Sequence, residues 1–160
     1  MKPVCKFIFL LGVISLGACV NFAPHVGLQG QDRQAVLASL GPPSQERRAA
    51  DGVRLVYTRS PYGKSTFFVN LDSQGRVAGW EDVLTPANFE KITVGMGTDD
   101  VENLIGPSKM MLTVNSRGHK AWLYPFHNST CQIFMVEVSP QNQVVSTGHG
   151  PAPECEGVSF

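Results

Sequence analysis

Few residues in this sequence have the type and spacing that catalysis or metal binding needs. Histidine occurs at four positions, none of them at the spacing of a zinc site: His25, His119, His127 and His149. Gly63-Lys64-Ser65 matches the end of a phosphate-binding loop, but Arg59 stands near the place of its first glycine. No serine lies in a nucleophile-elbow pattern. We therefore expect no catalytic residues, no bound metal and no cofactor.

The N-terminus is built like a secretion signal that ends at a cysteine. Lys2 and Lys6 supply positive charge, and residues 7–16 form an apolar run too short to span a bilayer. Leu16-Gly17-Ala18-Cys19 follows. This arrangement resembles the lipobox of bacterial lipoproteins, which implies cleavage before Cys19 and acylation of its thiol. The alternative is an ordinary signal peptide that is followed by a chance cysteine.

The lipobox resemblance implies a membrane anchor. Lipoproteins carry a diacylglycerol on the cysteine and usually a further acyl chain such as palmitate on the new amino terminus. Two or three such chains hold a protein stably, whereas one binds only marginally. Val20 follows Cys19 where an inner-membrane lipoprotein would tend to have aspartate. The resemblance thus implies the periplasmic face of the outer membrane, with residues 1–18 as signal peptide and 19–25 as tether.

The expected mature chain is long enough for one compact domain or two very small ones. Of its 13 Lys and Arg residues the chain would lose Lys2 and Lys6, which leaves 11 against 13 acidic residues and a net charge of −2. No basic stripe remains for nucleic acid, so we expect no such partner. In the oxidising periplasm, Cys131 and Cys155 are expected to form a disulfide, the alternative being two unpaired thiols.

The chain repeats itself at an offset of 65 residues. Gly30, Val36 and Gly41-Pro42 align with Gly95, Val101 and Gly106-Pro107, and Tyr57 then falls on Trp122. In the later strands the offset becomes 67, which predicts two extra residues in the middle hairpin of the second copy. Four matches carry this register: Phe67 with Phe134, Val69 with Val136, Leu71 with Val138 and Val77 with Val144.

Each copy is expected to hold two helices and four antiparallel strands. In the second copy Thr85-Pro86 starts a short helix, Thr98 caps the next one, and Gly106-Pro107 ends it. Strands are predicted over 44–50, 53–59, 66–71 and 76–83, and again over 110–115, 120–124, 131–138 and 143–147. The predicted fold is α+β, with two tandem helix–helix–four-stranded antiparallel sheet repeats over 26–84 and 85–150 and a tail over 151–160.

Two motifs carry a family resemblance behind the lipobox. They are Gly95-Met96-x-x-x-x-Val101-x-x-x-Ile105-Gly106-Pro107 and Asp72-x-x-Gly75-Arg76-Val77, separated by an aromatic strand in each copy. This pattern resembles the SmpA/OmlA (BamE-like) family of small outer-membrane lipoproteins, and its tandem form resembles the β-lactamase-inhibitor-protein fold. The resemblance covers roughly residues 25–150, although the barrel-assembly lipoprotein has a single copy of the unit.

The resemblance implies a non-enzymatic protein-binding module in envelope or outer-membrane assembly and maintenance. Its implied partners are the membrane, through the N-terminal lipid, and an envelope protein. The alternative is a periplasmic or surface inhibitor of an enzyme, and a hydrolase is least favoured. Strict strand alternation places one apolar set away from the helices, which predicts a concave binding sheet. The predicted contact residues are Trp80, Phe68, Val56 and Met135, with Tyr62 in a hairpin loop as a second site. Alternatively, the two repeats or the tails cover this face.

Overall fold

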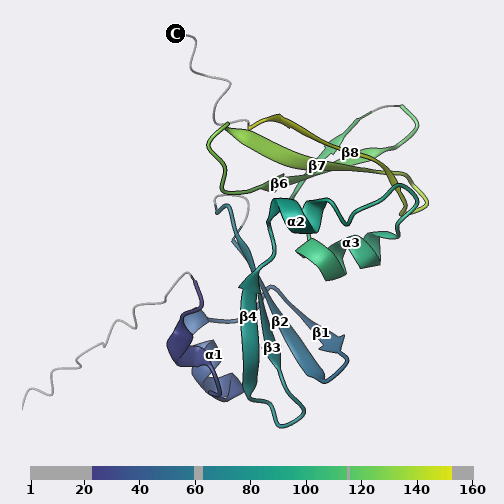
Figure 1. Ribbon diagram of the computed structural model, residues 1–160. Coiled ribbons are helices and arrows are strands. Elements are labelled where there is room, and N and C mark those ends of the chain that lie inside the picture. The colour runs from purple at the N-terminus through teal and green to yellow at the C-terminus, as the bar shows by residue number, and fades with distance from the viewer. Residues whose placement is uncertain (1–22, 60–62, 115, 153–160) are drawn as a thin grey trace, which may run out of the picture.

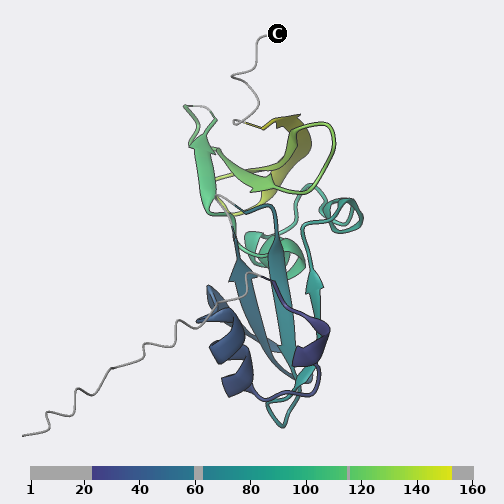
Figure 2. The same ribbon diagram turned by 90° about the vertical axis from the view of Figure 1, so that its left-hand side faces the viewer.

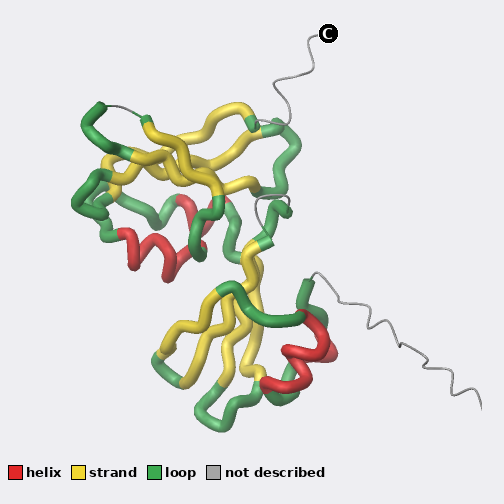
Figure 3. The backbone as a smooth tube through the Cα atoms, turned by 180° about the vertical axis from the view of Figure 1, so that it is seen from behind, coloured by secondary structure: helices red, strands yellow, loops and turns green. Residues whose placement is uncertain are grey.

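The computed structural model describes residues 23–59, 63–114 and 116–152, which form two four-stranded antiparallel sheets (Figure 1). Strands are neighbours in chain order in both sheets, β1-β2-β3-β4 and β5-β6-β7-β8. Short helices lie on one side of each sheet (Figure 3). Within these described ranges, no helix has the length and apolar character needed to cross a membrane.

The first sheet follows one short 3-10 turn and one helix. The turn is η1 (Val26–Leu28) and the helix is α1 (Arg33–Leu40), which Asp32 caps by accepting a hydrogen bond from the Ala35 amide at 2.9 Å. The strands are β1 (Gln45–Ala49), β2 (Gly52–Thr58), β3 (Thr66–Leu71) and β4 (Val77–Asp82). In the β3–β4 turn, the Asp72 carboxylate accepts hydrogen bonds from the amides of Gln74 and Arg76, both at 2.9 Å.

The second sheet follows two helices, α2 (Pro86–Phe89) and α3 (Thr98–Ile105). Proline begins α2 as predicted, but Thr85 makes no capping hydrogen bond, and the cap of α3 is Gly97 rather than Thr98. The strands are β5 (Met110–Thr113), β6 (Lys120–Pro125), β7 (Gln132–Val138) and β8 (Val144–Pro151).

The predicted helix–helix–sheet repeats are wrong, because the chain is mostly sheet. Where a first helix is predicted, the structure has the three-residue turn η1 in one half and the four-residue α2 in the other. Among the helices in the described residues, α1 and α3 alone reach eight residues. Helices this short are not stable alone, so packing sets their length. The side chains of Leu28 in η1 and Phe89 in α2 are buried in the core of their own half. Each of these short elements therefore contributes one apolar side chain to the core without a longer helix.

The two halves nevertheless have equivalent backbone hydrogen bonds between the last strand of the sheet and the segment that precedes α1 or α3. The amide of Gly30 donates to the carbonyl of Val77 at 2.9 Å, and that of Gly95 donates to the carbonyl of Val144 at 2.8 Å. Isolated bridges repeat in the same way, Asp32 with Arg76 and Gly97 with Gln143. The offset of 65 or 67 residues therefore corresponds to equivalent positions in space.

A tyrosine hydroxyl fixes the end of the helix in each half. Tyr57 donates to the carbonyl of Gly41 at 3.2 Å, and Tyr124 donates to that of Gly106 at 3.3 Å. Burial raises the pKa of both phenols, so they stay neutral donors. Tyr57 thus corresponds to Tyr124, and its predicted match with Trp122 is wrong. The two extra residues lie in the β5–β6 hairpin, because the β2–β3 and β6–β7 connections have equal length.

Each sheet buries its inward face against the helices of its own half. The first core joins Val36 and Leu40 of α1 to alternate residues of the strands, and the second joins Val101 and Ile105 of α3 in the same way. Helix α3 also lies between the two sheets (Figures 1 and 2). A Cβ atom added at Gly106 would lie only 2.7 Å from Cγ2 of Thr66 in β3. The end of α3 therefore touches the outer face of the first sheet.

Two equivalent glycines allow this contact to be tested. Gly41 and Gly106 have φ of 77° and 78° with extended ψ, a conformation that costs other residues about 1–3 kcal/mol. An added Cβ at Gly41 would meet nothing within 4 Å. We expect Gly41→Ala to lower the free energy of unfolding by that strain alone. Gly106→Ala should cost a further ~1–3 kcal/mol from overpacking. Urea unfolding of both variants measures the difference, and equal losses would contradict the close packing.

Candidate protein-binding surface on the second sheet

Two of the predicted contact residues, Val56 and Phe68, lie beneath the second half of the chain. Their exposed fractions are 0% and 1%, and together with Val83 they form a small buried cluster. The Cβ position of Gly106 lies 3.5 Å from the Phe68 ring and 3.7 Å from Val56. These two residues therefore do not lie on an open face, because the end of α3 covers them.

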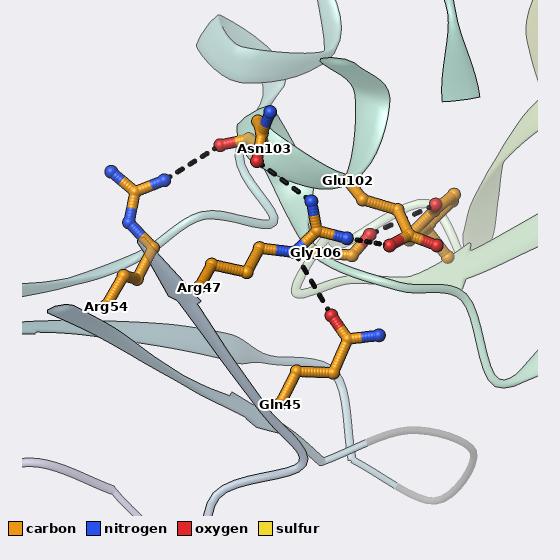
Figure 4. A network of polar contacts seen from close by, with 7 residues as sticks. Gln45, Arg47, Arg54, Glu102, Asn103 and Gly106 are labelled. Carbon is orange, nitrogen blue, oxygen red and sulfur yellow. Dashed lines mark hydrogen bonds and ion pairs between the residues drawn. The ribbon is translucent and has the colours of Figure 1, made fainter. Parts of the chain in front are cut away.

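A network of polar contacts holds α3 on this face (Figure 4). Arg47 of β1 pairs with the carboxylate of Glu102 and donates to the side-chain oxygen of Asn103 at 2.9 Å. Arg54 of β2 donates to the backbone carbonyl of Asn103 at 3.1 Å, and its guanidinium lies 4.4 Å from the centre of the Phe68 ring. The outer face of the first sheet is thus an internal contact.

Trp80 lies on the opposite side of the first sheet from the predicted one. The pairing of β3 with β4 shifts between Asn70 and Leu71, so that Ala78 is an extra residue in the ladder. One extra residue reverses the side on which later side chains point. Trp80 therefore packs beside Phe67 at 6.2 Å between ring centres and joins the core under α1. Its predicted role as an exposed anchor is wrong.

Met135 is the predicted contact residue that the structure leaves on an outer face. It belongs to the side of the second sheet that faces away from α2 and α3, next to a buried group formed by Leu123, Ile133 and Ala152. Figure 3 shows no helix on that side. Tyr62 and Cys19 lie outside the described residues, so their predicted roles stay predictions. Cys155 lies outside the described residues too, so its predicted pairing with Cys131 stays a prediction.

The outer face of the second sheet has exposed apolar side chains beside Met135. Leu112 is 60% exposed and Val114 is 48% exposed, and Leu112 pairs in register with Ala121 of β6. Val114, Ala121, Met135 and Gly148 line a hollow of about 230 Å³ together with Glu137, Ser146 and Thr147. Grouped exposed apolar side chains often mark a site of contact with another protein. We call this face, from Leu112 across Ala121 and Met135 to Gly148, the outer apolar face.

Strand β5 adds an open edge to this face. The amide of Val114 donates to the carbonyl of His119, which makes this pair a hydrogen-bonded one. Since such pairs alternate along an antiparallel ladder, the backbone groups of Met111 and Thr113 point away from β6. Among the described residues, no strand lies beyond β5. Met111 is itself 55% exposed, so the edge is apolar as well as unpaired.

The equivalent edge strand of the first sheet is charged. Gln45 corresponds to Met110, because their partners Val56 and Leu123 are 67 residues apart. Glu46 and Arg47 therefore stand where β5 has Met111 and Leu112. Charged side chains protect an edge from pairing with other chains, and Glu46 and Arg47 also bind Arg33 and Glu102. The second sheet lacks that protection.

The sequence alone did not identify this edge, although it held the signal. Strict alternation drew attention to large rings on central strands, whereas Met110-Met111-Leu112 is apolar on both sides and does not alternate. Comparison of the two copies at the 65-residue offset sets this run against Gln45-Glu46-Arg47. A difference in charge between equivalent strands is the observation that distinguishes the two edges.

A polar cluster lies on the same side of the second sheet, where Glu137 is the register partner of Ala121. Nδ1 of His119 lies 2.8 Å from Oε1 of Glu137, and the Ser146 hydroxyl donates to Oε2 of Glu137 at 2.9 Å. Both contacts lower the pKa of the Glu137 carboxyl, that of His119 more. Because the serine bonds to the carboxylate and not to the imidazole, the order of a nucleophile–base–acid set is missing. No group of three possible metal ligands occurs in the described part of the chain.

A second hollow of about 790 Å³ lies where the β2–β3 and β6–β7 connections approach each other. Two cations and an imidazole from these connections contribute to its wall, Arg59, Lys64 and His127, with Thr58 and Ser65 beside them. Such groups suit an anion. Residues 60–62, which lie between Arg59 and Gly63, are outside the described residues, so we assign no function to this hollow.

Comparisons with known proteins reveal only weak likeness. No protein-family model matches the chain, and no curated protein matches it. A DUF4309 family protein (YjgB) from Bacillus subtilis is 11% identical, with 85% of this chain and 83% of that one covered and a TM-score of 0.30. An extracellular protein containing an SCP domain from Bacillus anthracis is 13% identical, covers 92% and 50%, and has a TM-score of 0.32. Likeness at this level supports no conclusion on fold or function.

The burial of Phe68 predicts a core-sized loss on truncation. We expect Phe68→Ala to lower the free energy of unfolding by ~3–5 kcal/mol, because the ring fills the contact between the two halves. The matched control is Val94→Ala, an exposed apolar residue in the loop before Gly95, which should change it by less than about 0.5 kcal/mol. Denaturant curves compare the two, and a Phe68 loss as small as the control would contradict this placement.

The Glu137 cluster predicts a pH dependence with a defined sign. The pKa of Glu137 is lowered, so its contribution to stability is present above the ordinary glutamate value of about 4.3 and is lost as the pH falls through the folded pKa. His119→Ala should move the Glu137 midpoint upward, toward that ordinary value. Carboxyl NMR titration measures both midpoints. An unchanged Glu137 midpoint in the variant would rule out His119 as the main cause.

Proposed function

We propose that this chain is a non-enzymatic protein-binding module of the bacterial envelope, held at the periplasmic face of the outer membrane by lipid on Cys19. Its binding surface is the outer apolar face of the second sheet together with the edge of β5. The anchor part of this proposal rests on the resemblance of Leu16-Gly17-Ala18-Cys19 to a lipobox.

The observation that carries the binding part is the contrast between two equivalent edge strands. In the first sheet, Glu46 and Arg47 bind partners within the chain. At the same positions in the second sheet, Met111 and Leu112 are more than half exposed. Exposed methionine and leucine beside unpaired backbone groups favour contact with another chain, because association removes apolar surface from water and pairs the edge.

A binding role is also favoured over a catalytic one by the groups near this face. His119 and Ser146 each bind Glu137, so these three residues do not form a serine–imidazole pair that could attack a substrate. An inhibitor of an enzyme would use the same kind of surface, so the identity of the bound protein distinguishes an assembly factor from an inhibitor.

Photo-crosslinking in the native envelope tests the surface. A photoreactive residue at Ala121 has room, because Ala121 lines the hollow of about 230 Å³. We expect discrete adducts with protein from position 121. Leu112→Arg should reduce them about tenfold, since it places a charge in the contact, equivalent to losing ~1.4 kcal/mol of binding.

Two controls separate the surface from the anchor. The same photoreactive residue at Val94 samples an exposed apolar position elsewhere and should give no discrete adduct. Cys19→Ala should move the protein from the membrane pellet to the soluble fraction while position 121 keeps its adducts on addition of envelope protein. Equal adducts from 94 and 121, or none from either, would refute the binding surface.

A further inference from the structure

We infer that the outer apolar face is filled by helix α1 of a second copy of this chain, in the way that α3 fills the equivalent face of the first sheet. This inference rests on the proposed function, since it names the partner of the same surface. The copies would associate head to tail, each offering one α1 and one outer apolar face.

The chain itself contains the geometry of such a contact. Helix α3 turns Val101 and Ile105 to its own core and turns Glu102 and Asn103 to the first sheet. Arg47 pairs with the carboxylate of Glu102, and Arg54 donates to the backbone carbonyl of Asn103. The sheet that α3 covers is the one before it in the sequence. The second sheet has no following helix among the described residues to cover it in turn.

The equivalent residues of α1 and the second sheet are apolar where those of α3 and the first sheet are polar. At the 65-residue offset, Leu37 of α1 occupies the position equivalent to Glu102, and Ala38 the position equivalent to Asn103. On the second sheet, Leu112 is equivalent to Arg47, and Ala121 is equivalent to Arg54. The side-chain ion pair Arg47–Glu102 thus becomes the apolar pair Leu112–Leu37. Arg54, which donates to the backbone carbonyl of Asn103, is replaced by Ala121. Both members of the first pair change from polar to apolar together.

Both surfaces are accessible in the single chain. Ala38 is exposed on the side of α1 away from Val36 and Leu40, and Leu37 is half-buried on the flank of the helix. Space is open around Gly41, where an added Cβ meets nothing within 4 Å. On the sheet, the Leu123, Ile133 and Ala152 group closes one end of the face. Beside this group lie the exposed Leu112, the half-buried Ala121 and Met135, and Glu137, the register partner of Ala121. This is the part that the flank of a helix would contact.

Association of this kind uses two different patches, so it does not close on itself as a symmetric dimer does. The number of copies in such a head-to-tail oligomer would depend on the protein concentration. Lipid anchoring would raise the local concentration by holding all copies at one membrane surface. A weak contact in dilute solution can thus be populated in the envelope.

The test uses the full-length protein in its envelope with the photoreactive residue at Ala121. We expect an adduct of twice the chain mass whose crosslinked tryptic peptide is Gln34–Arg47, which contains Leu37 and Ala38. Leu37→Glu should reduce this adduct about tenfold. This substitution places in α1 the residue type that α3 carries at position 102, and a melting curve verifies that the variant folds.

Charge rescue gives the decisive comparison. Leu112→Arg alone should also remove the adduct, and Leu37→Glu combined with Leu112→Arg should restore it, because the pair recreates the Arg47–Glu102 contact between copies. Val94→Glu combined with Leu112→Arg is the matched control and should not restore it. An adduct of double mass that maps outside Gln34–Arg47, or that persists with Leu37→Glu, would overturn the inference.

The remaining outcomes separate this inference from the proposed function. If position 121 crosslinks a different protein and never a second copy, the inference fails and the proposed binding surface stands. If position 121 gives no adduct at all, both fail.

Discussion

The structure depends on the seating of one helix between two sheets. Helix α3 supplies Val101 and Ile105 to the second core, and its other side and its end touch the first sheet. Gly106 is central to this arrangement, because any side chain at that position would meet Thr66 before the helix reached the sheet. The two halves are thus joined by the close approach of Gly106 to Thr66 and by the hydrogen bonds of Arg47 and Arg54.

The ion pair between Arg47 and Glu102 orients this contact more than it stabilises it. Both side chains are only about one-fifth exposed, so they lose much of their hydration when they meet. Under such conditions the attraction is offset by the cost of desolvation, although removal of one partner alone is expensive. The hydrogen bonds from Arg47 and Arg54 to Asn103 fix the rotation of α3 about its axis. Position on the sheet comes from the apolar contact of Phe68, Val56 and Gly106.

The same framework of strands carries opposite surfaces in the two halves. Arg47 and Glu46 make the first edge strand part of an internal contact, whereas Leu112 and Met111 leave the second edge strand apolar and open. The backbone hydrogen bonds that are repeated in both halves, such as Gly30 to Val77 and Gly95 to Val144, do not depend on this choice. The side chains on one edge strand therefore decide whether a sheet face is used within the chain or presented to another chain.

The sequence by itself determined the local features of this protein. Asp51-Gly52 and Asp72 through Gly75 specify tight turns, Gly41 and Gly106 end helices, and the offset between them fixes which strands are equivalent. Each of these depends on the chemistry of a few neighbouring residues. Alternation also identified the inward face of β2 and β3 correctly, because no irregularity interrupts those strands.

Only the tertiary structure decided which faces are covered. The extra residue at Ala78 reverses the direction of Trp80, and a bulge of one residue leaves no clear mark in a short strand. The burial of Phe68 depends on α3, which lies some thirty residues further along the chain. The length of η1 and α2 was likewise set by the cores that Leu28 and Phe89 enter. Local propensity cannot report such contacts, because they exist only once the two sheets have met.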